Sequence, residues 1–182
     1  LVSSLYKAKI VRVTLDGKIS AFPGKVADGS MGGGGMEVDV KRQELWGAYI
    51  LGDQNKGFTK EKDGTSGLYK YDLTTGKIIK AYLLTPSPKH MLNDIALDKD
   101  GNAYITDSLT GQVYTVNRKR DKLEVFLPGQ SFFYANGIAI SHDGKYLFVA
   151  HIDGIARIEI ATKAIAHLSG PRGTVITNLN GM

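Results

Sequence analysis

Short runs of apolar residues alternate with polar residues along most of the chain, a pattern that predicts β-strands. In one such run, Tyr114 and Val116 alternate with Thr115 and Asn117. Glycine, aspartate and asparagine separate the runs, as is typical of tight turns. No segment combines helix caps with the three- and four-residue apolar spacing of an amphipathic helix. The chain is therefore predicted to be all-β, with almost no helix.

The strand pattern repeats, and the second copy lies 43 residues after the first. The two copies are Asn93-Asp94-Ile95-Ala96-Leu97-Asp98-Lys99-Asp100-Gly101-Asn102 and Asn136-Gly137-Ile138-Ala139-Ile140-Ser141-His142-Asp143-Gly144-Lys145. Each copy is followed by three further β-rich runs, at 103–107, 111–116 and 122–127 and at 146–151, 154–160 and 164–168. Four strands in about 40 to 45 residues are the signature of a β-propeller blade.

Other parts of the chain follow the same phase. Residues 35–39 and 67–72 match strands of the later units, and residues 2–13 align without a gap on residues 105–116. The chain begins partway through a unit, and another copy begins at Asn180. We therefore predict one β-propeller domain over residues 1–182, an incomplete arc of about four blades from a six-bladed ring.

One unit is longer than the others because of an insertion at residues 52–66. This stretch is polar and rich in glycine, and Phe58 is its single large apolar residue. It is interpreted as a surface loop; the alternative is a lid over the central mouth of the propeller.

Composition and charge exclude several classes of protein. The chain has no cysteine, which excludes disulfides, thiolate metal sites and a cysteine nucleophile. It has no apolar run of the roughly 18 residues that span a bilayer. The net charge is +5, but lysine and arginine are spread along the chain among acidic residues, so nucleic-acid binding is not expected. The expected protein is soluble, and the sequence does not distinguish a cytoplasmic from an exported one.

The two repeat copies resemble the gluconolactonase and senescence-marker-protein (regucalcin) superfamily of six-bladed propellers. The resemblance extends over essentially the whole chain through the successive blades. It implies a divalent cation, usually calcium and sometimes zinc, at one end of the central channel. It also implies that Asn136 is a metal ligand, and that Asn93 is a second ligand or a substrate contact. Amide oxygens suit a hard cation, although an asparagine can also cap a turn.

The chain departs from the family pattern at Gly34 and at Met91. Gly34 fills the ligand slot of an earlier unit and has no side chain to offer, whereas Asn180 fills the slot of the last. Met91 stands where sugar-lactonase members of the family carry an arginine that grips the substrate. Gly34 thus removes one metal ligand of the family pattern, and Met91 argues against recognition of a sugar acid.

Candidate proton carriers are few. His90 precedes Asn93 in a loop and is the best candidate for a substrate contact or proton shuttle, and Asp107 is a second candidate. His151 occupies the place of Asp107 one unit later, and the remaining histidines, His142 and His167, have no metal-ligand spacing.

Two functions are consistent with these observations. The first is a metal-dependent lactone or ester hydrolase of the gluconolactonase-like group, with a small-molecule substrate, a calcium-class cofactor, and Asn93 and Asn136 at the metal. The alternative is a non-catalytic propeller, similar to NHL-repeat arrays, that binds a protein or a glycan. The asparagine pair favours the enzyme, whereas the lack of an acid–base pair favours the binding protein.

Overall fold

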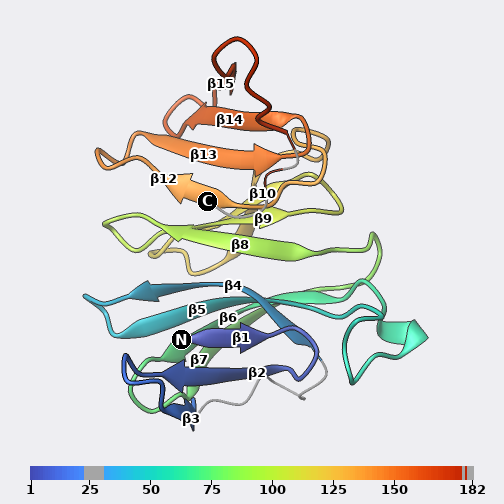
Figure 1. Cartoon of the computed structure of the whole chain (residues 1–182), viewed down its shortest axis with the longest axis vertical. Helices are drawn as coiled ribbons and strands as arrows, with labels where there is room; N and C mark the ends of the chain where they lie inside the picture. The colour runs from blue at the N-terminus through green and yellow to red at the C-terminus, as the bar shows by residue number, and fades with distance from the viewer. Residues whose placement is uncertain (23–30, 178, 180–182) are drawn as a thin grey trace. The chain divides into compact units, whose positions relative to one another are not determined.

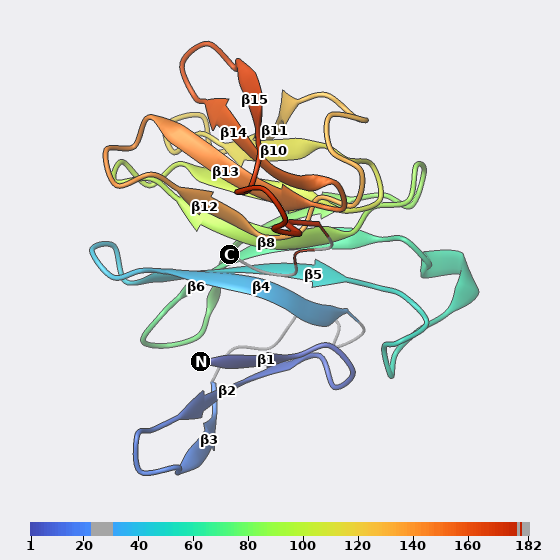
Figure 2. The same cartoon turned by 45° about the horizontal axis from the view of Figure 1, so that its top comes forward.

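The computed structural model describes residues 1–22, 31–177 and 179. These residues form antiparallel sheets, three with four strands and one with three, and the one helical element among them is the short 3-10 helix η1 (Lys60–Lys62). Each sheet takes its strands in chain order, as Figures 1 and 2 show. The chain divides into two compact units, Leu1–Leu92 and Asn93–Met182.

The N-terminal unit contains two sheets. The first has the order β1-β2-β3 and the second β4-β5-β6-β7. Their strands are β1 (Val2–Ser4), β2 (Lys9–Val13), β3 (Ile19–Ala21), β4 (Gly32–Asp39), β5 (Glu44–Ile50), β6 (Ser66–Asp72) and β7 (Ile78–Leu84). Tyrosines dominate the core of this unit: the rings of Tyr49 and Tyr69 meet edge to face at 5.2 Å, and the Tyr71 hydroxyl donates to that of Tyr49 at 3.1 Å.

The chain's single tryptophan, Trp46, lies on β5 and is buried in this unit. Its ring stacks on Tyr82 at 6.2 Å and 7°, and the Lys70 ammonium lies 5.1 Å from its centre. Its indole N–H is buried with no hydrogen-bond partner among the described residues. Trp46 therefore has a fixed and largely apolar environment.

The glycine run before Met36 lies inside β4, which begins at Gly32, whereas the repeat indicated a strand only over residues 35–39. Here the backbone of β4 passes very close to the first sheet. A β-carbon on Gly32 would overlap the Leu5 carbonyl and the Asn55 amide, and one on Gly33 would lie 2.8 Å from that of Ser3. The Ser3 hydroxyl donates to the Gly34 carbonyl at 2.9 Å across the same contact. Glycine is required here because only its backbone fits this spacing.

In the insertion between β5 and β6, the buried side chain of Asn55 connects the segment to the turn between β1 and β2. Asn55 accepts a hydrogen bond from the Gly52 N–H at 2.6 Å and donates to the Leu5 carbonyl at 2.7 Å. The Lys56 N–H also donates to the Tyr6 carbonyl at 3.0 Å. The segment therefore contacts the β1–β2 turn, and Phe58, its single large apolar residue, is only half-buried.

The C-terminal unit contains two four-stranded sheets, with the orders β8-β9-β10-β11 and β12-β13-β14-β15. Their strands are β8 (Leu92–Leu97), β9 (Ala103–Asp107), β10 (Val113–Val116), β11 (Leu123–Leu127), β12 (Ile138–Ile140), β13 (Tyr146–His151), β14 (Gly154–Glu159) and β15 (Ile165–Leu168). The two repeat copies thus form one sheet each, and β9 and β13 have the predicted bounds. A four-stranded antiparallel sheet in simple up-and-down order is a propeller blade.

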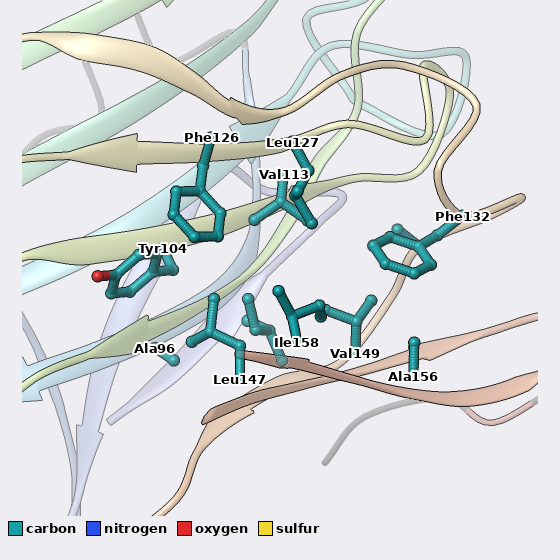
Figure 3. Packing of buried hydrophobic residues seen from close by; sticks show 12 residues of the cluster. Ala96, Tyr104, Val113, Phe126, Leu127, Phe132, Leu147, Val149, Ala156 and Ile158 are labelled. Carbon is teal, nitrogen blue, oxygen red and sulfur yellow. The ribbon is translucent and has the colours of Figure 1, made fainter. Parts of the chain in front are cut away.

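The core of this unit lies between the two sheets (Figure 3). Tyr104 and Phe126 from one sheet meet edge to face at 5.2 Å, and fully buried Leu147 and Ile158 belong to the other. Phe132, from the connection between the sheets, closes the other end of the same cluster. The core therefore joins blade to blade, which is how a propeller buries the alternating apolar positions of its strands.

Candidate functional site

The first strands of the two sheets, β8 and β12, are joined by a hydrogen-bond network that involves side chains from the end of β9. The Thr106 hydroxyl donates to the Asn136 carbonyl at 2.5 Å and accepts from the Asp94 N–H at 3.1 Å. Thr106 is fully buried. One hydroxyl therefore satisfies backbone groups of two neighbouring blades.

Ser108 extends this network to the predicted ligand Asn93. The Ser108 hydroxyl donates to the Ala135 carbonyl at 2.5 Å and accepts from the Asn93 side-chain amide at 2.9 Å. Asn93 is thus connected through a single hydroxyl to the residue before Asn136, so the structure brings the two predicted ligands to the same end of neighbouring strands. Because its amide nitrogen faces Ser108, the amide oxygen of Asn93 points to the other side of the group.

Asp94 lies beside Asn93 and also joins the two blades. Its carboxylate accepts the Ile138 N–H at 3.1 Å. Burial raises the pKa of Asp94, and the backbone N–H groups of Ile138 and Ile95 only partly offset this effect. In the following repeat copy this position is Gly137, so this bond belongs to the first blade of the pair.

The two asparagines supply part of the donor set that a calcium-class cation needs. Asn93 and Asn136 are both half-buried and supply two neutral amide oxygens. Calcium takes six to eight oxygen ligands, usually including carboxylates. Among the described residues, no group of three or more histidines and acids is placed to hold a metal. The chemistry of the two amides fits such a cation, but they complete only part of its ligand shell.

The two candidate proton carriers are buried. Asp107 is fully buried and accepts the Leu109 N–H at 3.1 Å, which caps the turn between β9 and β10. His90 is 7% exposed in the N-terminal unit, and its backbone N–H donates to the Gly64 carbonyl at 2.8 Å. Neither position presents its side chain to water.

His151 and His167 form a contact that the sequence did not indicate. Their rings lie 5.4 Å apart at 74°, and the His151 ring lies 5.4 Å from that of Phe132. Burial, followed by the nearby His167, lowers the pKa of His151. The Asp153 N–H donates to His151 Nδ1 at 3.3 Å, which leaves the ring proton on Nε2, a buried atom with no partner among the described residues.

A surface hollow of about 520 Å³ lies at the opposite end of the strands from Asn93. Asn102 and Asn117 line it, together with Arg120, Glu124 and Lys163. Arg120 is paired there with Glu124. The hollow involves neither asparagine of the predicted site. Asn180 lies outside the described residues.

No protein-family profile and no curated protein matches the sequence. Solved structures do match. A chain of a nidogen/laminin complex shares 15% identity and a TM-score of 0.66, over 92% of this chain and 60% of its own. Catalytically inactive virginiamycin B lyase from Staphylococcus aureus, solved with quinupristin, shares 19% sequence identity and a TM-score of 0.64. The match covers 96% of this chain and 52% of the lyase chain. The β-propeller domain of Myceliophteria thermophila Cps50 (Swd1) shares 13% sequence identity and a TM-score of 0.63. The match covers 92% of this chain and 55% of that chain.

These similarities establish the fold: the chain is an all-β protein built from β-propeller blades. It spans between about half and 60% of the length of these chains, as a partial propeller does. The fold class predicted from the repeat is therefore confirmed. No helix in the described part of the chain is long and apolar enough to cross a membrane.

Proposed function

We propose that the chain is part of a propeller hydrolase that opens a small lactone or ester with the help of a calcium-class cation. The observation that carries this proposal is the link from Asn93 through Ser108 to the Ala135–Asn136 backbone. It connects the Asn93 amide to the backbone beside Asn136, which supports a shared site for the two asparagines.

In this reaction the chain's own residues would bind and orient the cation and the substrate. Ser108 fixes the nitrogen of Asn93 so that the oxygen remains for a cation or a substrate, and Thr106 fixes the backbone of Asn136. When bound, the cation would polarise the substrate carbonyl for attack by water. The other oxygen ligands would come from water, substrate or residues beyond this pair.

Calcium titration by calorimetry tests the metal site. Asn93→Ala with Asn136→Ala should weaken calcium binding at least about tenfold, whereas Asn117→Ala, which changes an amide at the opposite end of the sheet, should leave it unchanged. Asn136→Asp should strengthen binding, because added ligand charge raises calcium affinity. Equal affinity in all four proteins would exclude the site, whatever the activity of the protein.

A second candidate function is a non-catalytic propeller that binds a protein or a glycan. The burial of Asp107 and His90 favours it, since an acid or base must reach the reacting atoms. Assays with aryl esters and small lactones, each with calcium, manganese or zinc, separate the two. Metal-dependent turnover supports the hydrolase, and its absence with every metal supports the binding protein.

A further inference from the structure

The loop between β11 and β12 exposes two adjacent aromatic side chains. Phe133 is 67% exposed and Tyr134 48%. They immediately precede Ala135 and Asn136, at the end of the blades described above. Large aromatic side chains usually contribute their surface to a core or an interface. An exposed pair beside a candidate site therefore indicates a contact with a ligand or a partner.

The loop that carries them is firmly held on both sides. The N–H groups of Gln130 and Phe132 donate to the Thr110 and Gly111 carbonyls at 3.1 and 3.3 Å. On the other side, the Ile152 N–H donates to the Phe133 carbonyl at 3.1 Å. Phe132 is buried in the core between the sheets. The two exposed rings therefore project from a backbone that is fixed before any ligand arrives.

The backbone at Tyr134 is strained. Its φ is +57°, in the left-handed region that costs a residue with a β-carbon about 1–2 kcal/mol. Strain of this kind persists where the surroundings enforce it, and it is common at ligand-binding positions. The equivalent positions of the preceding repeat are His90 and Met91, of which His90 is buried. Exposed aromatic residues are thus a property of this loop and not a requirement of the repeat.

The two rings do not cover one another. Their centres are 6.2 Å apart and their planes are inclined by 58°. A flat or chair-shaped ring can therefore stack on one face while the second ring forms a side wall. Two rings offer far less surface than the roughly 800 Å² that each partner contributes to a stable protein interface.

We propose that Phe133 and Tyr134 form a stacking platform for a pyranose ring of a carbohydrate. The C–H face of a pyranose carries partial positive charge and complements the negative face of an aromatic ring. The Asn136 amide, two residues further along the chain, can bond to the sugar hydroxyls, as the few polar groups of a ligand site do. This inference adds a ligand class to the proposed site and rests on the site's location, but it requires neither the metal nor hydrolysis.

Saturation-transfer NMR on the full chain tests the platform, with cellohexaose, chitohexaose and mannohexaose as probes and with EDTA present. At least one probe should receive saturation on its ring C–H protons when the aromatic protons are irradiated. Phe133→Ala and Tyr134→Asn should each weaken binding about tenfold or more. Asparagine tolerates a positive φ, so the second variant keeps the loop conformation. Tyr6→Ala removes a ring that is 57% exposed in the other unit and serves as the control.

The outcomes separate this inference from the proposed hydrolase. Binding in EDTA that both loop variants lose and Tyr6→Ala retains supports the platform even if no ester or lactone is turned over. Failure of all three probes to bind, or equal binding by the loop variants, would overturn it even if calcium binds. Reduced self-association of the loop variants in sedimentation, with sugar binding unchanged, would make the rings a protein contact and also overturn it.

Discussion

Replacement of Thr106 by valine should weaken the hydrogen bonding between the two blades of the C-terminal unit and lower the stability of that unit. Valine has nearly the shape of threonine, so the core packing is retained while the hydroxyl is lost. The Asn136 carbonyl then loses a donor at 2.5 Å, and the Asp94 N–H loses an acceptor at 3.1 Å. Asp94 lies on β8, and Asn136 lies two residues before β12, so both groups are beside the candidate site.

The size of the effect follows from burial. Thr106 is fully buried, so water cannot replace the lost bonds without opening the seam between the blades. Each unsatisfied buried polar group costs about 1–3 kcal/mol. Two groups lose their partner, so Thr106→Val should lower the free energy of unfolding by about 2–6 kcal/mol. Thr115→Val is the matched control, because the Thr115 hydroxyl is half-buried and makes one bond within its own sheet, to the Ala103 carbonyl at 2.9 Å; it should cost about 1 kcal/mol.

Urea unfolding followed by far-ultraviolet circular dichroism measures both variants. Hydrogen exchange with mass spectrometry then locates the change, which should appear in peptides that contain Asp94 and Ile138. If Thr106→Val destabilises the chain no more than Thr115→Val, the hydroxyl does not join the blades and the reasoning is wrong.

Three further changes test other parts of the structure. Gly32→Ala should lower the free energy of unfolding by about 3 kcal/mol because its β-carbon overlaps neighbouring backbone, whereas Gly52→Ala, which meets nothing within 4 Å, should be nearly neutral; urea titration compares them. Because the pKa of His151 is lower in the folded chain than in the unfolded chain, the unfolded chain binds this proton at a higher pH. The contribution of neutral His151 to stability is therefore complete above about pH 6.5 and is lost as the pH falls. Thermal melts from about pH 8 to 5 should show a smaller decrease in melting temperature for His151→Phe than for the unchanged protein. Tyr134→Gly should leave the urea midpoint unchanged or raise it, because glycine relieves the positive φ; Tyr134→Val should lower it by the equivalent of about 1 kcal/mol, because a β-branched residue disfavours that φ.

The repeat made the blades predictable from the sequence, because each strand is short and ends at a turn residue. The bounds of β9 and β13 agree with the predicted runs. The sequence did not show that β4 includes Gly32, because glycine has low strand propensity and the reason for its presence is a neighbouring sheet. Contacts between elements distant in the chain decide such cases.

The candidate site was predicted less completely. The two asparagines were identified by their register, and the structure brings them to one end of neighbouring strands. The hydroxyls of Thr106 and Ser108 were missed, since serine and threonine are common on strands and only the three-dimensional pairing shows their bonds. The exposed aromatic pair had a signal in the sequence, three consecutive aromatic residues just before Asn136, but exposure could not be predicted from it.

The burial of Trp46 gives the protein an intrinsic optical probe of one half of the chain. As the single tryptophan, fixed against Tyr82 and Lys70, it should emit at short wavelength while the N-terminal unit is folded and shift to the red when that unit opens. Circular dichroism reports the strands of both units. Coincidence of the two signals during denaturation would mean that the halves unfold as one cooperative system, whereas separate midpoints would give each half its own stability.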